Sequence, residues 1–231
     1  MKHQYFGDIN DYRKYGLLRL LAIEGGLRLG IAWMLTQDDG AGDGGKTGYI
    51  GHPERWRSLD PELFDYLAVS VAPGQQRNLT AFQDSDLIPQ ARFHSDLLPD
   101  EVASRAAQMD ALLIRFQGQD LVFFDPDNGL EVRSCPMGRK GSSKFLAMKE
   151  AEDAYRAGFS LLIYQHFGRT ERGAYITAQI DRLREATRAS EVIPVVTPHV
   201  LFLFALQPGH THAVRHVLDL LLGRWAGQFV L

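Results

Sequence analysis

Short apolar runs alternate with amphipathic segments along the 231 residues of this chain. The clearest runs cover residues 29–35, 121–124 and 159–165, and glycine or other turn-forming residues flank them. Continuous apolar runs of this length are typical of strands that are buried on both faces, as in a parallel sheet. Two more strands are predicted at residues 192–196 and 200–206. Because the link between them is too short for a helical crossover, they should pair antiparallel.

The segments between these strands show helical periodicity. Asp11 can cap a first helix that runs to about residue 22, and apolar side chains recur along it at helical spacing. A short strand is predicted at residues 91–95, and further helices at residues 61–72, 100–116, 143–157, 173–188 and 211–225. This alternation predicts one Rossmann-like α/β domain over residues 1–231. Its mostly parallel sheet would be flanked by helices and closed by an antiparallel C-terminal hairpin.

Composition narrows the class of protein. Hydrophobic residues make up 45% of the chain and charged residues 23%, with a formal net charge of −3, which are ordinary values for a globular protein. The single cysteine, Cys135, excludes an intrachain disulfide framework and a cysteine-based zinc site. No apolar run approaches the roughly 18 residues of a membrane span. We therefore expect a cytoplasmic protein with no membrane partner, while the sequence leaves the oligomeric state open.

Polar and glycine residues follow two of the predicted strands where each strand ends. In open α/β sheets, ligands bind beyond the carboxyl ends of the strands, and glycines let the backbone approach a ligand closely. The two strand ends are therefore predicted to form the functional site. Their residues are Asp38, Asp39, Gly40 and Gly42 after the first strand, and Asp125, Pro126, Asp127 and Asn128 after the strand at residues 121–124.

This layout is typical of a Rossmann-like methyltransferase. The glycines after the first strand would approach the methionyl part of S-adenosylmethionine, and the acids beside them would pair with its ammonium or hydroxyl groups. An exocyclic amine is a poor nucleophile because its lone pair is delocalised into the ring. A hydrogen bond to the Asp125 carboxylate can localise that lone pair, with Asn128 assisting. The predicted cofactor is therefore S-adenosylmethionine, and the predicted substrate is an amine of a nucleic-acid base.

A third segment of interest lies near the N-terminus and reads Gly7-Asp-Ile-Asn-Asp11-Tyr-Arg-Lys14. Together with the acid and glycines after the first strand and the later Asp125-Pro126 pair, it resembles bacterial adenine-N6 methyltransferases that act on large-subunit ribosomal RNA, the J-type family. Those proteins carry Gly-x-x-x-Asp-x-x-Lys, Asp-x-x-Gly-x-Gly and Asp-Pro-Pro-Tyr in this order. The resemblance implies that Asp11 and Lys14 fold over the bound cofactor. The opening Tyr5-Phe-Gly-Asp8 also resembles a set of bacterial proteins of unassigned function.

Two positions depart from the pattern of that family. Asp127 and Asn128 stand where the family has a second proline and an aromatic ring that stacks on the flipped base. Tyr164 or Phe167, on the next strand, could supply a ring instead. The family pattern also includes a second strand with an acidic end that holds the ribose. No such strand is evident between the glycine-rich loop and residue 91, which leaves Asp65 and Asp96 as candidates.

Two alternatives stay open. Asp38, Asp39, Asp125 and Asp127 could instead bind Mg²⁺ or Mn²⁺, because clustered carboxylates suit these ions, and two such ions can cleave phosphodiesters. The protein would then be a metal-dependent nuclease or phosphohydrolase. The departures at residues 127 and 128 support the other alternative, a binding module that derives from a methyltransferase and has lost catalysis.

Basic residues follow two successive strands and could bind the phosphates of RNA or DNA. The predicted substrate contacts are Asp127, Arg139, Lys140, Lys144 and Arg169. His166 directly follows the strand at residues 159–165 and should lie at the same edge of the sheet. Because histidine titrates near neutral pH, His166 is predicted to serve as a proton shuttle or a base contact.

Overall fold

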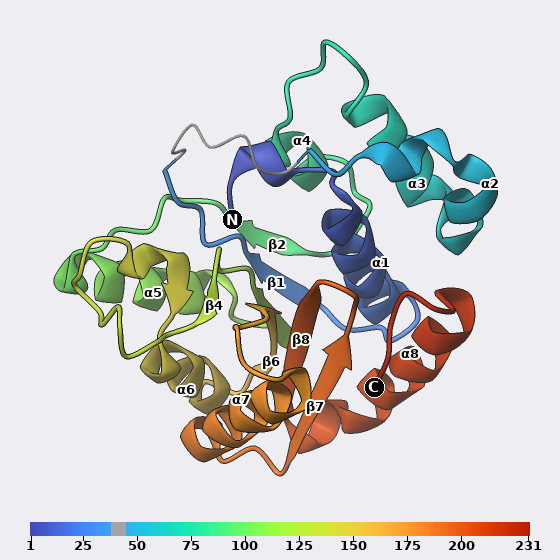
Figure 1. The fold of residues 1–231 in the computed structure, drawn as a ribbon. Helices are drawn as coiled ribbons and strands as arrows, with labels where there is room; N and C mark the ends of the chain where they lie inside the picture. The colour runs from blue at the N-terminus through green and yellow to red at the C-terminus, as the bar shows by residue number, and fades with distance from the viewer. Residues whose placement is uncertain (38–44) are drawn as a thin grey trace.

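A computed structural model describes residues 1–37 and 45–231 of the chain. Its centre is a six-stranded sheet in the order β2-β1-β3-β6-β8-β7 (Figure 1). The first four strands of this order run parallel, whereas β8 runs antiparallel to both β6 and β7. The prediction of a Rossmann-like α/β fold closed by an antiparallel hairpin is confirmed. The strands are β1 (Leu29–Ala32), β2 (Arg92–His94), β3 (Leu121–Phe124), β6 (Ser160–His166), β7 (Glu191–Val196) and β8 (Val200–Leu206).

Helices cover both faces of this sheet, and each face has its own hydrophobic core. Side chains of α1, α3, α4 and α8 pack on one face, and those of α5, α6 and α7 pack on the other (Figure 1). Along β3, Leu121 and Phe123 belong to the first core, whereas Val122 and Phe124 belong to the second. This alternation is that of a strand buried on both faces. The helices are α1 (Ile9–Ile23), α2 (Pro53–Trp56), α3 (Pro61–Ser70), α4 (Leu79–Gln83), α5 (Val102–Arg115), α6 (Met148–Arg156), α7 (Arg172–Thr187) and α8 (Thr211–Arg224).

Shorter elements join the main ones. A small parallel pair, β4 (Gly129–Leu130) with β5 (Phe145–Leu146), lies between β3 and α6. It occupies part of the segment predicted to be helical from residue 143, so α6 begins at Met148 instead. The 3-10 helices cover His3–Tyr5, Gly48–Gly51, Arg57–Leu59, Ser142–Lys144 and Pro208–His210.

Two boundaries near the start of the chain also differ from the predicted ones. Asp8, and not Asp11, caps α1, since its carboxylate accepts hydrogen bonds from the backbone amides of residues 10 and 11. Asp11 is thereby free to turn inward. β1 ends at Ala32, before the end of its apolar run, because Met34 has a positive φ of 46° that no extended strand accommodates. The chain resumes pairing only in the isolated bridge of Leu35 with Leu97.

Helix α1 is buried along almost its whole length, including its charged residues. At Gly16 an added Cβ would lie 2.1 Å from the indole ring of Trp225, so only glycine lets the segment after α8 pack this closely. Charged side chains in such a helix need partners, because an unpaired buried charge is strongly unfavourable. The partners of α1 are therefore informative about what holds it in place.

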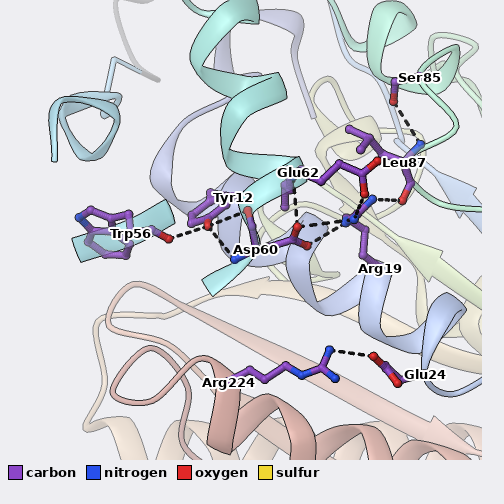
Figure 2. A network of polar contacts seen from close by, with 10 residues as sticks. Tyr12, Arg19, Glu24, Trp56, Asp60, Glu62, Ser85, Leu87 and Arg224 are labelled. Atoms are coloured by element: carbon purple, nitrogen blue, oxygen red, sulfur yellow. Dashed lines mark hydrogen bonds and ion pairs between the residues drawn. The ribbon is translucent and has the colours of Figure 1, made fainter. Parts of the chain in front are cut away.

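Arg19 fixes α1 to the start of α3 (Figure 2). Its guanidinium bonds the Asp60 carboxylate at 2.8 Å, the Glu62 carboxylate at 2.7 Å and the Leu87 carbonyl. Asp60 also caps α3 by accepting a hydrogen bond from the backbone amide of Leu63. One buried arginine therefore positions α1, α3 and the segment that leads into β2.

We predict that Asp60→Ala lowers the free energy of unfolding by about 3 kcal/mol, because it removes a cap and leaves the Arg19 guanidinium short of a carboxylate. Glu62→Ala is the matched control. The Glu62 side chain is 73% exposed, and an exposed partner contributes less than about 1 kcal/mol. Urea unfolding of both variants measures the difference, and equal losses would contradict this role of Asp60.

Candidate functional site

The sheet has a topological switch point between β1 and β3. From β1 the chain goes to β2 on one side, and it then returns to β3 on the other side. Such a switch leaves a crevice at the carboxyl ends of the strands, where open α/β proteins bind ligands. A cavity of about 290 Å³ lies at this end of the sheet. Its walls are Met1, Tyr5, Asp8, Asn10, Asp11, Lys14, Lys46, Asp125, Pro126, Asp127, Tyr164 and His166.

Lys14 joins α1 to the Asp125 end of β3 at the floor of this cavity. Its ammonium lies 2.6 Å from the Asp11 carboxylate and 2.7 Å from Oδ2 of Asp125. All three side chains are nearly fully buried, and Lys14 is only 2% exposed. The ammonium also lies 5.2 Å from the centre of the Tyr164 ring, a cation–π distance. The family resemblance implies that Asp11 and Lys14 fold over a bound cofactor. The structure places both side chains beside Asp125 at the cavity floor, and their role toward a cofactor stays a prediction.

The two carboxylates have different surroundings. Oδ2 of Asp11 accepts hydrogen bonds from the backbone amide of Gly7 at 3.0 Å and from the Tyr15 hydroxyl at 2.9 Å. Asp11 is therefore saturated and serves to hold Lys14. Oδ2 of Asp125 accepts a hydrogen bond from the Lys14 ammonium. Among residues 1–37 and 45–231, no group donates a hydrogen bond to its Oδ1. One carboxylate oxygen of the cavity floor is thus available to a ligand.

Burial sets the protonation behaviour of this group. Desolvation raises the pKa of Asp125 and of Asp11, although Lys14 opposes the rise in both cases. Desolvation also disfavours the Lys14 ammonium, but the two carboxylates outweigh it and the pKa of Lys14 is raised. The floor therefore holds one firmly charged ammonium between two acidic side chains, whose oxygens can accept from cations and N–H donors.

Asp127 occupies a second acidic position in the cavity wall. Its carboxylate accepts a 2.5 Å hydrogen bond from the Thr36 hydroxyl and forms a 2.5 Å ion pair with the amino group of Met1. That amino group also donates to the carbonyls of Met34 and Asp125. Although burial alone would raise the pKa of Asp127, the Met1 ammonium and the Thr36 bond outweigh it and lower the pKa. Asp127 and the two carbonyls thus form a set of acceptors that binds an ammonium.

Tyr164 and His166, at the end of β6, line the cavity beside Asp125. Their rings meet edge to face at 5.2 Å between centroids. Within the described part of the chain the Tyr164 hydroxyl has no hydrogen-bond partner. His166 is exposed to solvent on one side. Desolvation on the other side lowers its pKa despite the attraction of Asp125 and Asp127, so the imidazole is neutral near pH 7 and can accept a proton.

The loop after β3 owes its course to Gly129 and Gln165. Gly129 has a φ of 102°, and an added Cβ there would lie 2.3 Å from the Gln165 amide. That amide donates to the Tyr175 hydroxyl at 2.7 Å and accepts a 2.7 Å hydrogen bond from the backbone amide of Leu130. These contacts fix the loop directly behind Asp125 and Asp127.

The remaining predicted site residues do not line the cavity. Asn128 is exposed, and its backbone amide bonds the Lys144 carbonyl. Arg139, Lys140 and Lys144 belong to the loop between β4 and α6, and Arg169 is exposed in the loop after β6. The roles of these residues stay predictions. Asp38, Asp39, Gly40 and Gly42 lie outside the described residues.

The structure adds residues that sequence reasoning did not select. Asp8, Thr36 and Lys46 all reach the site or its acidic group. Asp8 stands in the N-terminal segment that carries the family resemblance but was not selected there, and no motif marks Thr36 or Lys46, whose positions depend on how α1 and the segment after β1 pack. Of the two rings considered, Tyr164 lines the cavity and Phe167 does not. Of the two ribose candidates, Asp96 follows β2, the parallel neighbour of β1.

A second polar cluster lies at the opposite end of β6. The Ser160 hydroxyl bonds Nδ1 of His210 at 2.9 Å, and Nε2 of His210 lies 3.9 Å from the Asp120 carboxylate. Ser160 is completely buried and also accepts a hydrogen bond from the backbone amide of Gln207. A catalytic nucleophile must be accessible to its substrate, and the buried Ser160 is not. This set of residues therefore has a structural role, in which it joins β6 to the end of β8.

Across residues 1–37 and 45–231, no three histidine, cysteine, aspartate or glutamate side chains are grouped to hold a metal ion. Of the four carboxylates named in the metal-dependent alternative, Asp38 and Asp39 lie outside the described residues, and Asp125 and Asp127 each pair with an amino group. In the same ranges no helix is long and apolar enough to cross a membrane.

Comparison of the chain with protein-family models, with curated proteins and with solved structures finds no match. The fold and the site therefore define a Rossmann-like α/β protein with an acidic cavity at its switch point.

We predict that Lys14→Met lowers the free energy of unfolding by about 3–5 kcal/mol near neutral pH, because two buried carboxylates lose their shared cation. The pKa of each carboxylate is already raised and would rise further. A carboxylate with a raised folded-state pKa destabilises the fold above that pKa, and protonation relieves this as the pH falls. The loss should therefore be smaller at about pH 5 than at about pH 8.

Urea unfolding at both pH values measures this change. Adding Asp125→Asn to Lys14→Met should recover part of the lost stability, because one of the two uncompensated charges is removed. A loss that is independent of pH, with no recovery in the double variant, would contradict the assignment of Lys14 as the cation of the site.

Proposed function

We propose that the protein is an S-adenosylmethionine-dependent methyltransferase that acts on an amine of a nucleic-acid base. The observation that carries this proposal is Asp125. Its carboxylate lies at the switch point of the sheet, Lys14 holds one oxygen, and the other oxygen has no donor among the described residues. An acceptor fixed in this way can bind an N–H group of the substrate without first leaving another partner.

The chemistry follows from this acceptor. S-adenosylmethionine supplies an electrophilic methyl group, whose bond to sulfur breaks as the bond to the amine nitrogen forms. Oδ1 of Asp125 would accept a hydrogen bond from the amine and direct its lone pair toward the methyl group. Methylation makes the nitrogen acidic, and its proton must leave. His166 is neutral, lines the same cavity and opens to solvent, so it would take the proton and pass it to water.

The residues present suit the cofactor chemically. A sulfonium and an ammonium are both cationic, and the cavity floor is acidic. Asp127 with the carbonyls of Met34 and Asp125 already binds an ammonium, that of Met1. Small-molecule pockets usually measure about 300–1,000 Å³, so a cavity of about 290 Å³ suits the reacting part of the cofactor and not its full length. Asp96, beyond the end of β2, is the residue that we expect to reach the ribose.

A catalytically inactive binding module is the second candidate. The observation that favours it is Asp127, whose carboxylate stands in the cavity wall where the resembling family has an apolar ring-stacking pair. A negative charge there would hinder a neutral base. Tyr164 partly offsets this loss, because it lines the same cavity and its hydroxyl has no hydrogen-bond partner among the described residues.

We predict that the purified protein binds S-adenosylmethionine in calorimetry and methylates single-stranded RNA or DNA with a radiolabelled methyl group. Asp125→Asn should bind the cofactor within about threefold of the unaltered chain, because Asp11 still holds Lys14. Its methylation rate should fall about 10²-fold, as for the loss of one preorganised electrostatic contact. Asp219→Asn, which removes the same charge from the exposed face of α8, is the control and should change neither quantity.

The other outcomes discriminate between the candidates. Absence of binding of both S-adenosylmethionine and its demethylated product overturns the methyltransferase proposal. Cofactor binding without methylation of any polynucleotide supports the binding module. Mn²⁺ binding that Asp125→Ala abolishes would favour the metal-dependent nuclease or phosphohydrolase.

A further inference from the structure

Exposed basic residues lie at and beside the cavity whose floor is acidic. Lys46 lines the cavity and is exposed. Antiparallel pairing of β6 with β8 places His166 beside Val200, and therefore next to His199 in the hairpin turn. Arg172, the first residue of α7, donates a 3.0 Å hydrogen bond to the Pro198 carbonyl in the same turn. Three segments that are distant in sequence thus bring Lys46, Arg172 and His199 to one rim.

The electrostatics agree with this placement. Desolvation lowers the pKa of His199, and Lys46, Arg13 and Arg172 lower it further, so all three cations act on the imidazole. Arg13 is buried and bonds the Gln228 amide, whereas Lys46, Arg172 and His199 are exposed. The positive potential of Lys46 and Arg172 is directed toward solvent beside the cavity. The neutral imidazole of His199 can add a hydrogen bond to this group.

Among the described residues neither Lys46 nor Arg172 forms an ion pair with a carboxylate, although the charge of Lys46 acts on Asp8 in the same cavity. Some exposed arginines elsewhere do pair, for example Arg156 with Glu152 and Arg215 with Glu191. The Arg172 guanidinium lies 4.2 Å from the centre of the Phe167 ring, which orients it without neutralising its charge. The rim therefore has preoriented cations available for an anion from solution.

We propose that Lys46, Arg172 and His199, here called the cationic rim, bind the phosphate backbone of a single-stranded polynucleotide whose base enters the cavity. This rests on the proposed function and names its macromolecular partner and the residues that hold it. A base inside a duplex could not reach Asp125 at the cavity floor, so the strand must present it unpaired. The rim replaces Arg139, Lys140 and Lys144 as the phosphate contact closest to the cavity.

Fluorescence anisotropy with labelled single-stranded RNA and DNA oligonucleotides tests the cationic rim. Binding should weaken with salt, and each neutralised phosphate contributes about −0.7 to the slope of log affinity against log salt concentration. Lys46→Gln and Arg172→Gln should each reduce the magnitude of the slope by about 0.7 and weaken binding at low salt. Arg172→Lys keeps the charge without the guanidinium contacts, and should retain the slope.

Arg156→Gln is the matched control. It removes the same charge from an exposed side chain at the end of α6, which precedes the opposite end of β6, and should leave affinity and slope unchanged. Thermal unfolding of each variant checks that the fold is retained. Three outcomes would each overturn the proposal. The first is that Arg156→Gln and Arg172→Gln have equal effects. The others are that the protein binds blunt duplexes, or polyglutamate, as tightly as it binds single strands.

The outcome can be separated from that of the methyltransferase test. If strand binding depends on Lys46 and Arg172 but the protein does not bind S-adenosylmethionine, the proposal of the cationic rim is supported and the proposed reaction is contradicted. If the protein binds the cofactor but no strand, the proposal of the cationic rim is contradicted, and the substrate is then a small amine.

Discussion

The ion pair between Lys14 and Asp125 is the interaction on which the site depends. It joins α1 to the end of β3 across 111 residues of sequence. Burying these charges is unfavourable, and their attraction compensates only when every remaining polar atom is well placed. Gly7 and Tyr15 meet that requirement by saturating Asp11. The position of α1 is therefore part of the chemistry of the cavity, and Arg19 with Asp60 holds the same helix from its other side.

Charge is arranged in two zones around the cavity. Carboxylates dominate the floor and wall, whereas the exposed Lys46 lines the cavity and Arg172 bonds the neighbouring hairpin turn that holds His199. This separation suits a ligand that is itself divided, with a cationic or N–H-bearing part inside and anionic groups outside. A net charge of −3 for the whole chain conceals this division, because it sums over both zones.

The fold was largely predictable because its strands are buried on both faces, and such strands give continuous apolar runs that sequence displays directly. A motif marked Asp11, Lys14 and Asp125 as site residues, but it did not show that Lys14 pairs with both carboxylates. Tyr164 was a candidate from its place on the strand that ends beside the site. Thr36 and Lys46 had no such signal, since their place at the site follows from the positive φ at Met34 and the packing of α1. The cap of α1 was misassigned because Asp8 and Asp11 both precede an apolar repeat, and only tertiary packing shows which of them turns inward.

Gly129 and Gln165 determine the backbone path of the loop after β3, whereas other residues of that loop supply its functional groups. The loop turns where it does because no side chain fits at Gly129 against the Gln165 amide, and neither residue contributes a functional group to the cavity. Asp127 and Asn128 lie between this fixed turn and Asp125. Their side chains can differ while the turn at Gly129 is kept, although a change at Asp127 also removes its contacts with Thr36 and Met1. The same scaffold can therefore acquire a new ligand preference through two side chains, with Asp125 and the fold around it left in place.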